Sequence, residues 1–292
     1  MKSNYRCIAL TGANGFLGSR LFAFLRTHAY TVVPISSHLY KRGAGVDMQY
    51  ELANVFCQAQ PDVLIHTAAI SDTGCCENNP SDSFDSNVNF TSVCAQLCEQ
   101  IGCKMIFTSS DQVYSALLAG EHSENTALSS NVYGRHKLEA EAAASRFCPD
   151  TVSLRLTWMY DLLSCGMKTH NNILLRIIRA AMANTPIKFS STDFRGITYV
   201  YEVVKNIEAA FELDGGVYNF GSGSSHSAYD IACTIMNAIG LGGRCDELII
   251  KDENSTPRDI RMDTAKAQAH GIYFSDSCEG ILKCISDYTI GL

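Results

Sequence analysis

The sequence of 292 residues predicts an α/β protein with a doubly wound parallel sheet and a smaller C-terminal lobe. Short apolar runs alternate with helix-like segments in the first half, which is typical of a parallel sheet covered on both faces. Right-handed crossovers between such strands give the doubly wound arrangement. The later segments change to long connections and helices. We therefore expect residues 1–160, with 197–221 returning to them, to form the sheet domain, and residues 161–196 and 222–292 to form the smaller lobe.

The expected elements follow in chain order. The strands are a run ending at Thr11, then residues 31–36, 62–67, 103–108, 151–157 and 216–220. The helices are residues 16–26, 52–60, 80–102, 132–147, 173–183 and 199–213, followed by a helix, a loop and a further helix. Pro80 suits the first turn of the third of these helices, because proline needs no hydrogen-bond donor there. Residues 161–172 read as a polar connection and residues 251–258 as an exposed loop.

Three glycines follow the first predicted strand at a spacing of three: Gly12, Gly15 and Gly18. Glycine lacks the Cβ atom that would hold a phosphate away from the backbone. A tight turn from a strand into a helix also directs free amide groups and the helix dipole at an anion. The position of this motif predicts a dinucleotide site of the Rossmann type. The alternative interpretation is an ordinary glycine-rich turn.

A second motif places Tyr133 and Lys137 four residues apart in a predicted helix, so that they share one face. A lysine ammonium beside a phenol favours the phenolate and moves its pKa towards neutral pH. A phenol tuned in this way can act as a general acid or base. Ser110 ends the preceding strand and could donate a hydrogen bond at the same edge of the sheet. Alternatively, Tyr133 and Lys137 are solvated and Ser110 caps a turn.

Composition excludes several classes of protein. The net charge of −7 argues against a nucleic-acid surface, and no apolar run is long enough to span a membrane. The 13 cysteines are scattered and odd in number, and no leader segment is evident, which predicts reduced thiols in the cytoplasm. Cys94 and Cys98 fit a buried helix stripe, and no spacing indicates a metal site.

These motifs together resemble the extended short-chain dehydrogenase/reductase family. The matching segments span nearly the whole chain: residues 11–18 (TGANGFLG), 66–69 (HTAA), 107–110 (FTSS), Tyr133 with Lys137, Asn89, 155–160 (RLTWMY), 195–200 (RGITYV) and 263–266 (DTAK). Within the family the chain is most similar to the dTDP-4-dehydrorhamnose reductases, through residues 131–134, the Trp158 segment, Asn171 and Asn172.

That resemblance implies a set of site residues. Ser110, Tyr133 and Lys137 would be catalytic. The cofactor would contact Gly12, Asn14, Gly15, Phe16, Leu17, Gly18, Ser36, Asp47, Met48, Thr67, Ala68, Ala69, Asn89, Thr108, Tyr133 and Lys137. The substrate would contact Asp111, Gln112, Trp158, Asn171, Arg195 and Thr198.

The resemblance implies hydride transfer from a nicotinamide to the ketone of a nucleotide-activated sugar, with Tyr133 protonating the product. Family members that are 4,6-dehydratases carry Asp then Glu after the catalytic hydroxyl. This chain has Asp111 and Gln112, and a neutral amide cannot act as that base, which disfavours a dehydratase. A nucleotide-sugar 4-epimerase stays open. So does a non-catalytic NADP-binding regulatory subunit, because the regulatory beta subunit of methionine adenosyltransferase resembles the same branch.

The second predicted strand ends without the carboxylate that would bind the ribose of NAD. Lys41 and Arg42 follow closely and could pair with a 2′-phosphate, which favours NADP over NAD. The alternative is that both belong to a solvated loop. The family also forms dimers, so we expect a homodimer.

Overall fold

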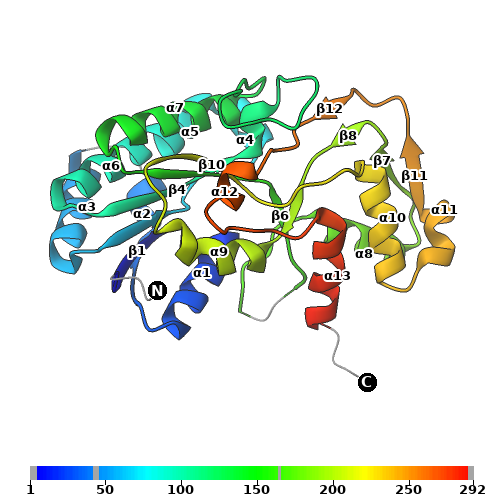
Figure 1. Ribbon diagram of the computed structural model, residues 1–292, viewed down its shortest axis with the longest axis horizontal. Helices are drawn as coiled ribbons and strands as arrows, with labels where there is room; N and C mark the ends of the chain where they lie inside the picture. Colours follow the sequence, from blue (N-terminus) through cyan, green and yellow to red (C-terminus); the bar gives the residue numbers. More distant parts are fainter. Residues whose placement is uncertain (1–4, 42–45, 164–165, 289–292) are drawn as a thin grey trace.

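The computed structural model describes residues 5–41, 46–163 and 166–288, and for residues 40–47 the backbone alone at most (Figure 1). Its largest unit is a six-stranded sheet in which all neighbouring strands are parallel. In sheet order the strands are β10 (Gly216–Phe220), β5 (Val152–Leu156), β4 (Lys104–Ser110), β3 (Val63–His66), β1 (Cys7–Thr11) and β2 (Thr31–Ile35). The predicted doubly wound fold is confirmed.

The order of the strands reverses between β1 and β3. The chain passes from β1 to β2 on one side and then crosses to β3 on the other, where Thr11 pairs with His66. Connections leave such a point in opposite directions, so a crevice opens beyond the carboxyl ends of the two strands. The predicted glycine motif follows Thr11 and therefore lies at this crevice.

Helices cover both faces of the sheet (Figure 1). On one face, α1 (Phe16–Thr27) and α9 (Val200–Ala210) pack on inward side chains such as Ile8 and Leu10. On the other face, α3 (Val46–Ala59), α6 (Phe90–Ile101) and α7 (Val132–Phe147) pack on Ala9 and its neighbours. The alternation of residues 8–10 between two cores is the period of two that a buried strand imposes.

Two predicted helices differ in the structure. The one expected at 52–60 begins earlier, at Val46, and the one expected at 80–102 is interrupted. After α4 (Thr73–Asn78), the chain forms α5 (Pro80–Phe84), one π turn η1 (Asp85–Asn89) and then α6. The π turn contains Asn87, whose side-chain amide bonds both the N–H and the C=O of Ile70. A π turn inserts one residue into a helix and is often found at functional sites.

The second half adds short strand pairs and helices around a separate core that contains Tyr160, Ile177 and Ile235. Its paired strands are β6 (Trp158–Tyr160) with β9 (Ile197–Tyr199), β7 (Ile187–Ser190) with β11 (Ile249–Asp252), and β8 (Asp193–Phe194) with β12 (Arg258–Asp259). Its helices are α8 (Ile173–Ala183), α10 (Ala228–Ala238), α11 (Cys245–Leu248) and α13 (Ser277–Tyr288), with the 3₁₀ turn η3 (Gly242–Arg244).

The remaining short elements are α2 (His38–Lys41), the 3₁₀ turn η2 (Asp111–Tyr114) and α12 (Ala265–Gln268), which contacts β10. The loop predicted at 251–258 corresponds to the connection between β11 and β12. It is shorter than predicted, because β11 extends to Asp252 and β12 begins at Arg258. Within the described ranges, the model contains no helix long and apolar enough to cross a lipid bilayer.

Candidate active site

The glycine turn between β1 and α1 depends on all three glycines. Gly12 has a φ of +69°, which disfavours any side chain, and a Cβ on Gly18 would lie 2.1 Å from the carbonyl oxygen of Gly12. Gly15 is the N-cap of α1, and its position brings no side chain to the first amide groups of the helix. These amides and the helix dipole fit the pyrophosphate of a dinucleotide. Asn14 is exposed on the same turn.

A buried hydrogen-bond chain shapes the neighbouring loop after β3. His66 lies between two hydroxyls, with Nδ1 2.7 Å from Thr11 Oγ1 and Nε2 2.9 Å from Thr91 Oγ1. Burial lowers the pKa of His66 to about 3, and Lys137 acts in the same direction, so the ring is neutral. The Thr11 hydroxyl also accepts the backbone N–H groups of Thr67 and Ala68. Thr67, Ala68 and Ala69 are thereby held beside the glycine turn.

The other predicted cofactor residues lie in varied surroundings. The side chains of Leu17 and Met48 are buried in the two cores of the sheet, which leaves their backbone groups as possible contacts. Phe16 packs edge-on against His170, with ring centroids 4.0 Å apart. Ser36 is exposed at the end of β2, where its hydroxyl lies 2.8 Å from His38 Nδ1.

Two further predicted cofactor residues are Asn89 and Asp47. Asn89 donates to Asp85, whereas its neighbour Asn87 holds the loop after β3, a role that the sequence did not reveal. The side chains of Asp47 and Lys41, and the whole of Arg42, lie outside the described residues. Asp47 is one of the predicted cofactor contacts, and Lys41 with Arg42 carried the preference for NADP.

The structure brings Ser110, Tyr133 and Lys137 together at the carboxyl end of β4. Asn131 caps α7 by accepting the N–H of Gly134, and the backbone of Gly134 packs so closely on Gln112 that a Cβ would lie 2.4 Å from its carbonyl oxygen. This approach sets Tyr133 beside Ser110. One turn along α7, Lys137 Nζ donates to the carbonyl of Thr108 at 2.8 Å and lies 5.8 Å from the centre of the Tyr133 ring.

Burial dominates the electrostatics of this group. Desolvation raises the pKa of Tyr133, the charge of Asp111 raises it further, and a hydrogen bond with Ser110 partly opposes both. Desolvation lowers the pKa of Lys137 to about 8, although Glu141 opposes the shift. The expected lowering of the Tyr133 pKa by Lys137 is therefore wrong. Removal of water from the phenolate outweighs the effect of a cation whose own charge is disfavoured.

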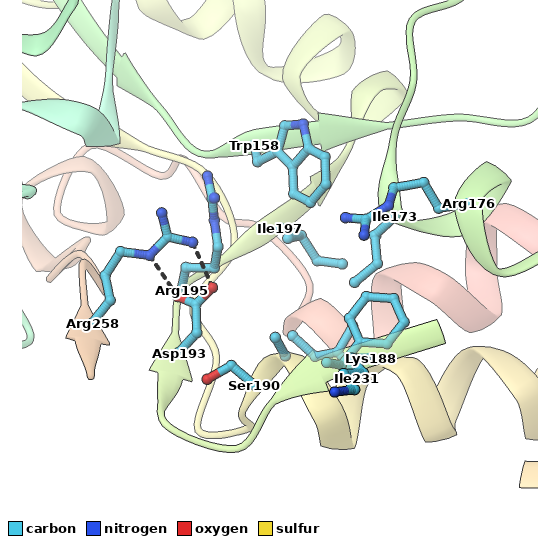
Figure 2. Close-up of a pocket in the computed structure, with 12 residues that line it drawn as sticks. Trp158, Ile173, Arg176, Lys188, Ser190, Asp193, Arg195, Ile197, Ile231 and Arg258 are labelled. Atoms are coloured by element: carbon cyan, nitrogen blue, oxygen red, sulfur yellow. Dashed lines mark hydrogen bonds and ion pairs between the residues drawn. The ribbon is translucent and has the colours of Figure 1, made fainter. Parts of the chain in front are cut away.

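A cavity of about 290 Å³ opens among the short strands and helices of the second half (Figure 2). Trp158 and the aliphatic side chains of Ile173, Ile197 and Ile231 form apolar walls. The cavity also collects cationic side chains from separate elements. They are Arg176, Lys188, Arg195 and Arg258. Arg258 binds Asp193 in a two-point ion pair at 2.8 and 2.5 Å, whereas Arg195 Cζ lies 5.1 Å from the centre of the Trp158 ring.

The predicted substrate residues divide into two groups. Trp158 and Arg195 line the cavity. Arg195 forms a 3.0 Å ion pair with Asp111, and Asp111 in turn accepts hydrogen bonds from Ser110 and Gln112. Asn171 and Thr198 lie elsewhere. Asn171 is exposed and accepts from Arg179.

Thr198 is fully buried, as are both of its neighbours in β9. Its hydroxyl lies 2.5 Å from that of Thr157 and accepts the N–H of Ser222, so it is already occupied within the protein.

Sequence reasoning missed most of the cavity. Arg176, Lys188 and Asp193 were not singled out, and Arg258 was assigned only to the exposed loop at 251–258. These residues come from α8, β7, β8 and β12, which are far apart in the chain and adjacent only after folding. The available signal was modest: basic residues recur in the predicted smaller lobe although the whole chain is acidic.

Cys94 and Cys98 lie on a buried face of α6, as the sequence predicted. Cys94, Cys98 and Cys103 are buried in the core, and each cysteine in the described ranges is a free thiol. Among the described residues, one group could approach a metal ion: His226, Asp276 and Cys278, whose ligand atoms lie within 4.8 Å of one another. This group lies at the start of α10 and α13, separate from Tyr133.

The parallel sheet carries Ser110, Tyr133 and Lys137 at the same edge as the glycine turn. This fold and arrangement define an extended short-chain dehydrogenase/reductase, as the sequence predicted. Comparison with protein families makes the assignment specific. Residues 6–289 match the RmlD substrate binding domain, and the chain belongs to this family.

Similar proteins include both enzymes and a subunit. A dTDP-4-dehydrorhamnose reductase from Bacillus anthracis, solved in complex with NADP, superposes with a TM-score of 0.84 at 19% identity, covering 98% of this chain and 100% of that one. A UDP-glucose 4-epimerase from Thermotoga maritima, solved with UDP-glucose, gives a TM-score of 0.79 at 18% identity, covering 96% and 97%. Methionine adenosyltransferase 2 subunit beta from Danio rerio is 24% identical over 250 residues, or 81% of this chain and 75% of that protein.

Proposed function

We propose that this protein is an NAD(P)-dependent oxidoreductase that reduces the ketone of a nucleotide-activated sugar, in the manner of dTDP-4-dehydrorhamnose reductase. The observation that carries this proposal is the group of Ser110, Tyr133 and Lys137 at the carboxyl end of β4. This is the same edge of the parallel sheet as the uncapped N-terminus of α1, which follows β1. The likeness to the reductase solved with NADP supports it.

Each side chain has a role in this proposal. The Ser110 hydroxyl donates a hydrogen bond to the substrate oxygen. Tyr133, whose pKa is raised by burial, stays protonated and gives its proton to the alkoxide that forms. Lys137 orients the ribose and stabilises the tyrosinate left behind. The nicotinamide, when bound, supplies the hydride. Gly12, Gly15 and Gly18 would hold the pyrophosphate of the dinucleotide cofactor.

The cavity supports a nucleotide sugar as substrate. A nucleoside diphosphate combines a flat base with two anionic phosphates. The cavity offers Trp158 as an aromatic wall, together with the cations Arg195, Arg176 and Arg258. Guanidinium groups bind phosphates with matched geometry. We further propose that the chain divides into lobes, residues 1–160 with 197–221 and residues 161–196 with 222–292, and that the sugar reaches from the cavity to Tyr133.

Two alternatives use the same residues differently. A 4-epimerase needs Ser110, Tyr133 and Lys137 together with room for the sugar to turn, and the likeness to the UDP-glucose 4-epimerase favours it as the second candidate. A regulatory subunit would bind the cofactor without turnover. Gln112 follows Asp111 where a 4,6-dehydratase would need a carboxylate, so we do not propose a dehydratase.

The decisive experiment incubates the protein with NADPH and a panel of dTDP- and UDP-linked keto-sugars and follows NADPH absorbance. Net oxidation, lost in Y133F, is the expected result, with kcat falling by a factor of about 10² or more. Turnover of a 4-hydroxy sugar without net use of cofactor would indicate the epimerase. Bound NADP with no turnover of any sugar would indicate the regulatory role.

We propose NADP rather than NAD on the sequence at Lys41 and Arg42, and a cytoplasmic location on the free thiols. We propose a homodimer by resemblance to the family, which forms dimers. Parallel titrations with NADPH and NADH, and a molar mass from light scattering, test the first two.

A further inference from the structure

Asp111 is the most enclosed carboxylate near the proposed catalytic group. Only 2% of its surface is exposed, and both of its oxygens are occupied. Oδ2 forms the ion pair with Arg195 Nη2 at 3.0 Å. Oδ1 accepts from the Ser110 hydroxyl at 3.3 Å and from the amide of Gln112 at 3.1 Å. The carboxylate therefore has little capacity left for a direct contact with substrate, which was its predicted role.

Arg195 pairs with Asp111 on one side and borders the cavity on the other. Its guanidinium lines the cavity beside Trp158, and Nε is buried without a hydrogen-bond partner among the described residues. A buried N–H donor without an acceptor is costly, and an anionic ligand in the cavity would relieve that cost. Arg195 is thus positioned to hold Asp111 with one nitrogen and a substrate phosphate with another.

We propose that Asp111 is a positioning residue that joins the phosphate-binding Arg195 to the hydroxyl of Ser110 in one charged network. This inference rests on the proposed function and deepens it. A phosphate bound to Arg195 fixes the guanidinium, and the guanidinium fixes the carboxylate. The carboxylate accepts the single proton of the Ser110 hydroxyl and so holds this group beside Tyr133 until a substrate oxygen takes over that hydrogen bond. Occupancy of the nucleotide end of the site thereby organises the end where proton transfer occurs.

A carboxylate is required at this position for a geometric reason. Asp111 accepts on both oxygens at once, from a cation on one and from neutral donors on the other. An asparagine has the same shape, but its amide nitrogen would face either the guanidinium or the serine hydroxyl as a second donor. D111N therefore keeps the packing and breaks one side of the network.

The second ion pair of the cavity provides a matched comparison. Asp193 pairs with Arg258 in the same cavity, and both of its carboxylate oxygens bind Arg258 rather than Arg195 or Ser110 (Figure 2). D193N removes a carboxylate from a cavity cation, as D111N does. A general change in cavity charge would affect both variants alike, whereas the proposed network predicts that only D111N strongly lowers kcat.

The test measures binding and turnover in D111N, R195Q, the double variant and D193N. Binding of UDP and dTDP is measured by calorimetry without cofactor or sugar, and folding is checked by thermal denaturation. We expect D111N and R195Q each to weaken binding of the diphosphate by about 5- to 50-fold, with the double variant no weaker than R195Q alone. With a turned-over sugar, D111N is expected to lower kcat at least 10-fold, and D193N is expected to raise KM more than it lowers kcat.

The outcomes separate this proposal from the proposed function. Losses that multiply in the double variant would show that Asp111 and Arg195 act independently, and would overturn the network. Unchanged kcat in D111N would also overturn the link to Ser110. If no sugar is turned over, the proposed function fails. The affinities of D111N, R195Q and the double variant for UDP and dTDP still measure the coupling of Asp111 and Arg195. If D111N does not fold, R195K, which retains a cation but not the two-sided guanidinium, tests the same link through kcat.

Discussion

Lys137 is buried, and the negative charge of Glu141, one helical turn further along α7, favours its protonated form. Glu141 is itself held by Arg155, with contacts of 2.9 and 2.7 Å, and it accepts the hydroxyl of Ser109. The charge of Lys137 thus depends on Glu141, whose carboxylate is held in place by Arg155. This arrangement makes the protonation of Lys137 sensitive to pH in an accessible range.

The pKa of about 8 predicts the pH dependence of catalysis. Below this value Lys137 carries its charge, and above it the charge is lost, so kcat/KM should be level near pH 7 and fall as pH rises through about 8. A plot of kcat/KM against pH, which reports the free enzyme, is the measurement. A level profile between pH 7 and 10 would contradict an essential ammonium.

Replacement of Glu141 should move that profile. E141Q removes the largest influence that favours the charged lysine, so the fall in kcat/KM should begin at lower pH. The variant should also lose roughly 3–5 kcal/mol of stability, because Arg155 would remain buried without its partner. E139Q, an exposed change on the same helix, is the control and should alter neither the profile nor the urea midpoint.

At the scale of elements, the turn between β1 and α1 allows almost no adjustment. In G18A the new methyl group would meet the Gly12 carbonyl, a backbone atom that cannot move without opening the turn. We expect a loss of roughly 1–3 kcal/mol in stability and at least a 10-fold weaker affinity for NADPH. Urea denaturation and NADPH fluorescence measure the two effects.

Gly243 provides the control for that substitution. A Cβ at this position meets no atom within 4 Å, and its φ is not in the left-handed region. G243A should therefore leave both measurements unchanged. Equal effects of G18A and G243A would show that glycine content, rather than the packing of the turn, controls the result.

Elements with a clear local signal could be predicted from the sequence. Residues 173–183 and 132–147 form helices at the predicted bounds because Asn172 and Asn131 cap them, and the apolar run at 216–220 forms β10. The π turn could not be predicted, since it accompanies a bond between Asn87 and the distant backbone of Ile70. The motif residues were predicted at the correct edge of the sheet, whereas the cavity cations depend on strand pairs formed by tertiary contacts.

The fully buried ion pair of Arg20 and Asp161 connects the sheet domain to the second half of the chain. Arg20 on α1 binds Asp161 just after β6, and neither side chain is exposed to solvent. The second oxygen of Asp161 accepts from Tyr288 near the end of α13, and Arg20 also donates to the carbonyl of Lys168. The helix that follows the glycine turn is thereby bonded to the connection after β6 and to the last described helix.

Breaking this pair should destabilise the fold as a unit. D161N would leave the Arg20 guanidinium buried without a full counter-charge, at a cost of roughly 3–5 kcal/mol, whereas R20M/D161L, which removes both charges, should be much closer to the parent. Urea denaturation followed by circular dichroism measures each variant, and E253Q, from the exposed pair of Lys251 and Glu253, should be indistinguishable from the parent. A double variant less stable than D161N would show that the hydrogen bonds to Tyr288 and Lys168, rather than the balance of charge, hold the halves together.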